Sequence, residues 1–300
     1  MLSTPCTANS RGQLSGIAHA PDRERKLGRK ALAFVLALLS ASACGCQTTS
    51  RAQTVGPPGR MSQLVREEQA VSVDHVAEVW RLVWKAPPEP VCSAADPLWT
   101  TCGCSGFAFG EGGRLDLVRV RQGHEYDRLA LTPFFDDETP TRGPRAVVQR
   151  WNVQSQDLEQ GESEELASRV ATRPPAKIMQ LADYDHDGSA TEFFLQTGTL
   201  PCGKEMGIAV GVSGRQGRLH AFGTALHPDR PLVMQRQQWY ALRDAAGSIR
   251  VKDLPCGDHL RGTETELELG VTASGIRAVR REFACQENNQ RGRLLSESIM

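Results

Sequence analysis

The segment Asp183-Tyr184-Asp185-His186-Asp187-Gly188 lies between two apolar stretches. The fold must therefore place three neighbouring carboxylates between two segments that are expected to be buried. The aspartates alternate, so a curled backbone turns all three carboxylates inward, and Gly188 permits the positive φ that closes the loop. Carboxylates this close repel one another unless a cation neutralises them. A flexible site built only from oxygen atoms suits Ca²⁺ best among the divalent cations.

Apolar stretches on both sides of this loop predict strands. Lys177–Leu181 leads into the loop and Glu192–Leu195 leaves it, so the implied unit is strand, cation loop, strand. A hairpin is expected to turn at Gly110–Gly113. Further strands are predicted at residues 115–120, 146–151, 207–212, 219–222, 249–251, 266–269 and 275–285. The fold class is therefore mainly β, as a β-sandwich or as partial propeller-like sheets, with one or two short helices and disulfide staples.

Two segments of the body have helical signatures. One helix is expected from about Pro231 to Ala245, with Asp229 as the N-cap and Gly247 at its exit. Residues 162–170 have the length and pattern for two helical turns.

Residues 73–84 are ambiguous between helix and strand. Several valines recur at helical spacing, whereas Trp80, Leu82 and Trp84 alternate as they would in a strand. We expect a short amphipathic helix here, with an edge strand as the alternative.

The N-terminal part has the order of a secretory signal peptide. A basic block that ends at Lys30 precedes the apolar run Ala31–Leu39, and small residues follow up to Ala43. The apolar run is too short to remain in a bilayer as a spanning helix. Residues 1–22 are polar and of no use to such a signal, so translation is expected to begin near Leu27.

The signal ends in a stretch that resembles a bacterial lipobox. Ala41-Ser42-Ala43 precedes Cys44, so the resemblance implies an exported lipoprotein that is attached to the bacterial membrane through a lipid on Cys44. Ala41 stands where a lipobox prefers a larger aliphatic residue, and this leaves ordinary cleavage and secretion as the alternative. Either way the protein is expected in the periplasm or on the outer surface.

Three regions follow from this organisation. Residues 1–43 are the N-terminal extension and signal peptide, and residues 44–70 are a flexible tether rich in Gln, Thr, Ser, Gly and Pro. Residues 71–300 form a β-rich globular body that contains the calcium loop at 183–192.

Cysteine usage agrees with export. The body holds an even number of cysteines, as expected for disulfides in an oxidising compartment: Cys92, Cys102, Cys104, Cys202, Cys256 and Cys285. Cys92 could close a short loop with Cys102 or Cys104, and another pair is available among Cys202, Cys256 and Cys285. The sequence leaves the connectivity open.

Composition narrows the class of partner. Lys plus Arg number 35 and Asp plus Glu also number 35, so no basic field exists to recruit nucleic acid. The chain has no G-x-S-x-G elbow, H-E-x-x-H helix, phosphate loop or dinucleotide-binding glycine motif. Its partners are expected to be the membrane and an unidentified protein or glycan.

The segment Leu181–Phe193 resembles the D-x-D-x-D-G calcium loops of FG-GAP and VCBS-type β-propeller repeats, which join two strands. The resemblance implies that Asp183, Asp185 and Asp187 are calcium ligands. It also implies a fourth ligand from the Ser189 carbonyl and an acidic ligand at Glu192.

The loop departs from related patterns in two respects. An EF-hand loop has an acidic residue at its twelfth position, which is Phe194 here, and the tenth position holds Glu192. Propellers of the FG-GAP type carry the loop in several blades, whereas this chain has it once. A full propeller is therefore not expected.

Two functions from different classes fit these features. The first is an exported, lipid-anchored module in which calcium fixes one loop for a structural or binding role. The second is an exported hydrolase whose acid-rich loop holds a catalytic metal, with Asp183 or Asp185 as a catalytic carboxylate. A structural site is closed by protein oxygens, whereas an enzyme needs an open position beside a pocket with a second acid or base.

Overall fold

The structure is a computed structural model that describes residues 64–91, 109–135, 145–152, 164–200, 204–257 and 262–300. All of them belong to one unit, Met61–Met300. The predicted signal peptide with its lipidation site Cys44 lies outside the described residues. So do four of the six body cysteines: Cys92, Cys102, Cys104 and Cys202.

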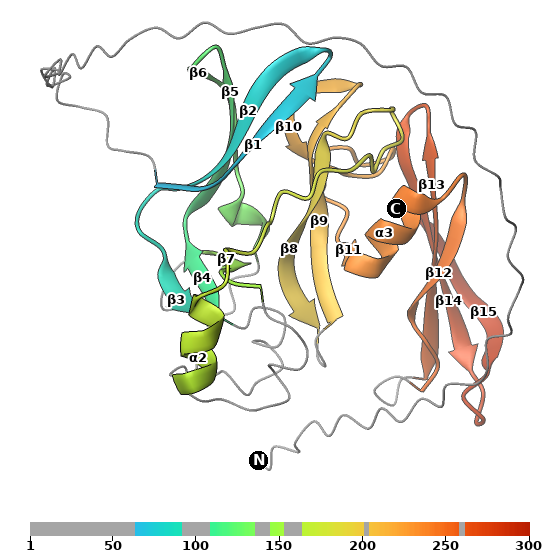
Figure 1. The fold of residues 1–300 in the computed structure, drawn as a ribbon. Coiled ribbons are helices and arrows are strands. Elements are labelled where there is room, and N and C mark those ends of the chain that lie inside the picture. The colour runs from blue at the N-terminus through green and yellow to red at the C-terminus, as the bar shows by residue number, and fades with distance from the viewer. Residues whose placement is uncertain (1–63, 92–108, 136–144, 153–163, 201–203, 258–261) are drawn as a thin grey trace, which may run out of the picture. The chain divides into compact units, whose positions relative to one another are not determined.

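Three four-stranded antiparallel sheets account for most of the unit (Figure 1). The first has the order β1 (Leu64–Val73), β2 (Val76–Trp84), β5 (Leu115–Arg121), β6 (His124–Ala130). The second is built on β9 (Lys204–Ser213), which pairs with β8 (Glu192–Leu200), β10 (Gln216–Ala221) and β11 (Met234–Gln235). The third has the order β12 (Ile249–Leu254), β13 (Thr263–Thr272), β14 (Gly275–Cys285), β15 (Arg291–Ile299).

The remaining elements are short. A three-stranded sheet has the order β3 (Glu89–Val91), β4 (Gly110–Gly113), β7 (Ala146–Gln149). The helices of the described part are α2 (Glu164–Ala171), α3 (Arg236–Asp244) and the single 3-10 turn η2 (Thr132–Phe134). Within the described ranges, none of them has the length and apolarity that a membrane span requires. The prediction of a mainly β body with one or two short helices is confirmed.

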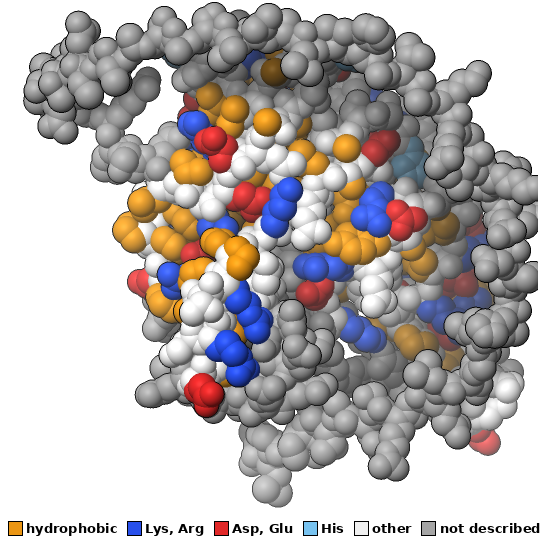
Figure 2. All heavy atoms as spheres, in the orientation of Figure 1, with side chains coloured by type: hydrophobic (Ala, Val, Ile, Leu, Met, Phe, Trp, Pro, Cys, Tyr) orange, Lys and Arg blue, Asp and Glu red, His pale blue; other side chains and the backbone are white. Residues whose placement is uncertain are grey.

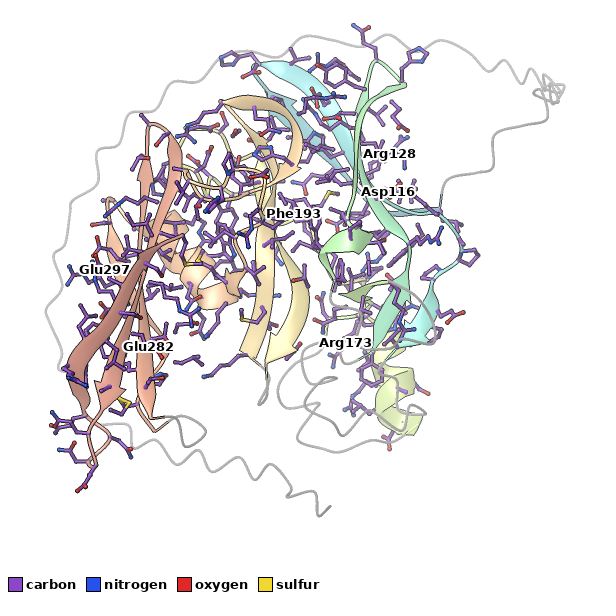
Figure 3. All side chains as sticks on the ribbon, turned by 180° about the vertical axis from the view of Figure 1, so that it is seen from behind. Asp116, Arg128, Arg173, Phe193, Glu282 and Glu297 are labelled. Carbon is purple, nitrogen blue, oxygen red and sulfur yellow. A yellow bond between two sulfur atoms is a disulfide. The ribbon has the colours of Figure 1, made fainter. Side chains whose placement is uncertain are left out.

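Strands β8 and β9 separate two hydrophobic cores because their side chains alternate between the two faces of the sheet. Phe193 and Val210 are fully buried against the first sheet, and Figure 3 shows Phe193 directed into that core. Phe194 and Ala209 face the other way and pack with α3 and with strands β13 and β14. The sheets therefore stack face against face, as in sandwich layers or propeller blades.

Buried charges tie the first sheet to the second. Arg119 on β5 is 1% exposed and donates to both oxygens of Glu78 on β2, at 2.7 and 2.8 Å. The Nη1 group of Arg119 donates to the Gly217 carbonyl on β10 at 2.7 Å. On the edge of the same sheet, Arg128 reaches Asp116 on the neighbouring strand at 2.5 Å (Figure 3).

The expected helix at residues 73–84 is wrong. Val76–Trp84 is strand β2, and it is interior, since it pairs with β1 and with β5. Trp80 and Leu82 are completely buried, so the two-residue alternation was the signal that mattered. The helical recurrence of valine has no structural counterpart here, because β-branched residues fit a pleated sheet equally well.

Two further expectations about strands and turns are wrong. Gly110–Gly113 is not a turn but strand β4, which pairs with β3 and β7. Lys177–Leu181 is not a strand and pairs with no neighbouring strand in the described part of the chain. The amides of Ile178 and Met179 instead donate to the Glu67 carboxylate, at 2.7 and 3.1 Å.

Helix α3 begins later than predicted. Met234 and Gln235 pair with β9 as strand β11, which delays the helix to Arg236. Its N-cap is Gln235, in a reciprocal capping box with Gln238, and not Asp229. At the N-terminus, Leu64 already pairs with Trp84, so the folded body starts within the stretch that was predicted as tether.

Candidate metal centre

Backbone hydrogen bonds close the acidic loop. Ala182 and Glu192 exchange amide-to-carbonyl bonds of 2.7 and 3.1 Å, which form the neck of a loop that leads directly into β8. Inside it, His186 and Gly188 have positive φ values of 54° and 90°. The predicted role of Gly188 is thus confirmed, since a residue with a Cβ would be strained there.

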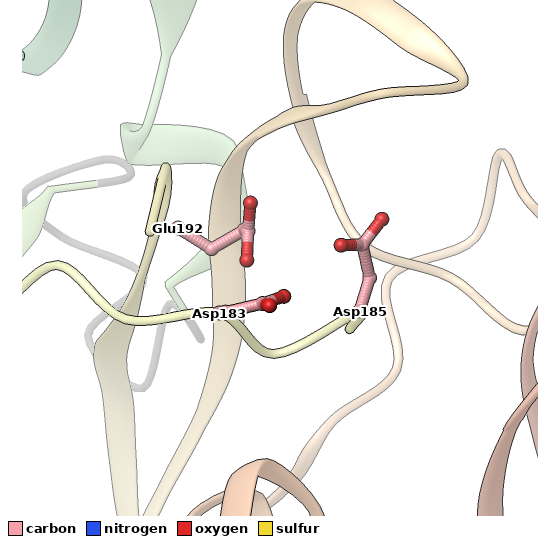
Figure 4. Close-up of side chains that lie close together, drawn as sticks. All are labelled: Asp183, Asp185 and Glu192. Carbon is pink, nitrogen blue, oxygen red and sulfur yellow. The ribbon is translucent and has the colours of Figure 1, made fainter. Parts of the chain in front are cut away.

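Three carboxylates converge in this loop (Figure 4). Asp183, Asp185 and Glu192 each present an oxygen, and these oxygens lie within 4.8 Å of one another. Asp185 is 1% exposed and Glu192 is 0% exposed. The arrangement could hold a metal ion, with every side-chain donor a hard oxygen.

Of the carboxyl groups in this cluster, Glu192 has the pKa that is shifted furthest from its usual value. Burial, and then the negative charges of Asp185 and Asp187, raise the pKa of Glu192 to about 9, although hydrogen bonds from Thr191 and the Tyr184 amide oppose the shift. The Thr191 hydroxyl lies 2.8 Å from Glu192 Oε1 and 2.7 Å from the Val212 carbonyl oxygen. A hydroxyl has only one proton to donate. Both contacts are hydrogen bonds when Thr191 donates to the Val212 carbonyl and a protonated, neutral Glu192 donates to the Thr191 oxygen.

Asp185 has an internal counter-ion. Burial and the charge of Asp187 raise the pKa of Asp185 to about 6, while Arg215 acts in the opposite direction. The Arg215 guanidinium lies 3.2 Å from Asp185 Oδ2 and also donates to the carbonyls of Thr272 and Ala273, at 2.8 and 2.9 Å. Arg215 thereby links the β9–β10 turn, the acidic loop and the β13–β14 turn.

Asp187 contacts backbone amides. Its carboxylate accepts the Ser189 amide at 2.8 Å and the Gly214 amide, which fastens the loop to the β9–β10 turn. Its own amide donates to Asp183 and Asp185, at 3.1 and 3.3 Å. Of the predicted side-chain ligands, the structure brings together Asp183, Asp185 and Glu192, and directs Asp187 to backbone amides.

Arg215 and Thr191 are the site residues that the sequence did not indicate. Thr191 adjoins a predicted ligand, so its position was a signal that could have been used. Arg215 comes from another hairpin, 30 residues after Asp185. No local pattern in the chain marks that contact.

A pocket of about 180 Å³ adjoins the outer side of Asp185. Arg215, Ser213 and His220 contribute to its lining, and Glu192 does not. His220 stacks on Phe222 with ring centroids 4.4 Å apart, and burial lowers the pKa of its imidazole. A neutral base therefore lies in a pocket next to one member of the acidic cluster.

The described part of the chain contains one disulfide, Cys256–Cys285, with Cα atoms 5.6 Å apart. It joins the turn after β12 to the end of β14. This confirms a pair among Cys202, Cys256 and Cys285.

Comparisons of the chain with family profiles, with characterised proteins and with solved structures find no match.

Proposed function

We propose that this protein is an exported, lipid-anchored binding module in which Ca²⁺ fixes the loop 183–192. The observation that carries the proposal is the convergence of oxygens from Asp183, Asp185 and Glu192 within 4.8 Å. The signal-peptide pattern and Cys44 support the export and the anchor.

The donor set favours calcium over other metals. All three side chains are carboxylates, and no histidine or cysteine belongs to the group. Zn²⁺ and Cu²⁺ prefer nitrogen and sulfur, whereas Ca²⁺ takes oxygen ligands in irregular geometry and accepts backbone carbonyls such as that of Ser189. Mg²⁺ demands a near-octahedral shell, which a loop with a buried wall is less suited to supply.

Burial favours a structural role over a catalytic one. Asp185 and Glu192 are almost completely buried and contact Arg215 and Thr191, and of the two only Asp185 borders the pocket that contains His220. A cation there would join the acidic loop to β8, and so to the centre of the fold. Calcium would displace the proton of Glu192 and part of the attraction of Arg215, so its affinity should be modest, on the order of 10⁻⁴ to 10⁻³ M.

Calcium titration calorimetry combined with thermal unfolding tests the proposal. Free Ca²⁺ at about 100 times its dissociation constant should stabilise the parent by about 2.7 kcal/mol. Glu192→Gln copies the shape of the neutral glutamate, so it should unfold near the parent temperature without calcium and lose the calcium response. Asp185→Asn should lose the response too, while Asp74→Asn, in the exposed β1–β2 turn, should keep it.

Arg215→Gln should change calcium affinity in the opposite direction from the ligand variants. Removing a positive charge 3.2 Å from a ligand oxygen should raise calcium affinity several-fold. It should also lower the stability of the calcium-free protein, because two carbonyl contacts are lost. A parent that shows no calcium heat and no shift in unfolding temperature would refute the calcium assignment.

A metal-dependent hydrolase is the second candidate, and the pocket beside Asp185 is the observation in its favour. His220 could serve as a base there, and Arg215 could bind an anionic substrate group. Assays against phosphate and carboxylate esters, with His220→Gln as the comparison, would separate the two functions. Turnover that depends on both His220 and a divalent metal would support the hydrolase and displace the structural role.

A further inference from the structure

A second pocket, of about 150 Å³, opens where the end of β7, the segment before the acidic loop, β8 and α3 meet. Its inner wall contains Tyr184 and Phe194, which are 1% and 7% exposed. Among the other lining residues, Lys177 is exposed, and Arg236 and Tyr240 are half-buried. A cavity of about this size holds one six-membered ring.

The lining of this pocket is cationic. Lys177 and Arg236 both contribute to it, and no carboxylate does among the described lining residues. Figure 2 shows Lys and Arg side chains on this face near α2, and between β8 and α3 it shows them interspersed with Asp and Glu side chains. Glu205 does not line the pocket but pairs with Arg236, so Lys177 and the remaining guanidinium donors of Arg236 are the groups that favour an anion.

Arg236 is held in place but retains donor capacity. Its Nε lies 2.6 Å from Glu205 Oε2, and its Nη2 group donates to Gln196 Oε1 at 3.3 Å. Its guanidinium also rests 5.1 Å from the centre of the Phe194 ring. Within the described residues the Nη1 group has no hydrogen-bond acceptor, so a carboxylate could accept from a preorganised arginine.

The other walls suit a ring that carries hydroxyl groups. Tyr240 meets Phe194 edge to face, with centroids 6.4 Å apart, and is itself a lining residue that carries a phenolic hydroxyl. The amide side chains of Gln149 and Gln180 also line the pocket. Aromatic faces contact the C–H surface of a sugar ring, while amides and a phenol exchange hydrogen bonds with its hydroxyls.

We propose that this pocket binds a small acidic sugar, a uronate of monosaccharide size, with its carboxylate between Arg236 and Lys177. The site is separate from the acidic cluster and does not require its cation. Tyr184 is shared, since its amide donates to Glu192 at 2.8 Å and the residue also lines the pocket. Calcium would therefore tune the pocket without creating it.

Titration followed by calorimetry or by amide chemical shifts tests the proposal, with glucuronate as the probe, glucose as its neutral match and inorganic phosphate as a plain anion. Each is measured with excess Ca²⁺ and with EDTA. Glucuronate should bind under both conditions, at least tenfold more tightly than glucose and than phosphate. Failure of the calcium proposal alone would leave the EDTA result intact.

Variants locate the contact. Arg236→Gln should weaken glucuronate binding at least tenfold, Arg236→Lys should restore part of it, and Lys177→Gln should weaken it several-fold. Lys177 is exposed, so its replacement tests the charge without endangering the fold. Arg280→Gln, an exposed change on β14 that does not line the pocket, should leave binding unaltered.

The proposal would be overturned by no binding of glucuronate to the parent, by equal affinity for glucose and glucuronate, or by an Arg236→Gln variant that binds as the parent does. Phosphate binding as tight as glucuronate binding would also overturn the sugar assignment, since a simple anion site would then explain the lining.

Discussion

Glu192 and Glu78 are both buried carboxylates, yet their surroundings shift their pKa values in opposite directions. Glu192 has only neutral donors and negative neighbours, so burial prevails and raises the pKa of its carboxyl. Burial also acts to raise the pKa of Glu78, but hydrogen bonds from Arg119, Arg121 and Trp80 outweigh it and bring the pKa below the usual 4.5. Glu192 is therefore suited to bind a cation, whereas Glu78 already has two cationic partners, Arg119 and Arg121.

Glu78 should be a large contributor to stability. Glu78→Gln leaves buried Arg119 with only the more distant carboxylate of Asp127, at 3.8 Å, so we expect a loss of about 3–5 kcal/mol in urea unfolding. Glu68→Gln is the matched control. Its pair with Arg81 is exposed and should contribute about 0–1 kcal/mol.

The same pair predicts an acid dependence. A carboxyl whose folded pKa is lowered adds stability above its unfolded value of 4.5, and this is lost as the pH falls through the folded pKa. Stability of the parent should therefore decline more steeply below about pH 5 than that of Glu78→Gln. Parallel decline in the two proteins would show that Glu78 is not responsible.

At the level of elements, strands β8 and β9 organise the molecule. They carry the neck of the acidic loop, separate the two cores and supply Phe194 to the proposed sugar pocket. The third sheet is tied to this centre through α3 and through Arg215. Its far end is held by the Cys256–Cys285 disulfide, which joins the turn after β12 to the end of β14.

Loss of this disulfide should have a local effect. Replacing Cys256 and Cys285 by serine opens a loop with a sequence separation of 29 residues, and we expect destabilisation of about 3–4 kcal/mol. Hydrogen exchange should accelerate near Cys285 in β14 and at the start of β15, while β8 and β9 stay protected. Uniform acceleration across all sheets would mean that the third sheet does not open independently.

At the level of the whole molecule, the proposed lipid anchor and the folded body lie in different parts of the chain. The first described strand begins at Leu64, about twenty residues after Cys44. If Cys44 is lipidated and these residues act as the predicted tether, a flexible chain of that length would span roughly 25 Å.

Fractionation of cells tests the anchor. Cys44→Ser should release the protein from the membrane fraction, whereas Cys46→Ser, two residues further on, should leave it attached. Several acyl chains are needed for stable attachment, as a bacterial lipoprotein would supply. A parent that is already soluble would show that the protein is secreted without a lipid.

The sequence by itself determined the features that depend on neighbours along the chain. These include the acidic loop with its turn at Gly188, the strand that follows it, the β class and the pattern of an export signal. Each depends on residue spacing or on the conformational preference of single residues, so a short window contains the information.

The tertiary structure decided what depends on contacts across the chain. It brought Glu192 to Asp183 and Asp185, turned Asp187 to the Gly214 amide and placed Arg215 against the cluster. It also made residues 76–84 an interior strand, because β5 was available to pair with it. Burial and cross-strand pairing arise only when distant segments meet, and these two factors set the charge state and the partners of the site.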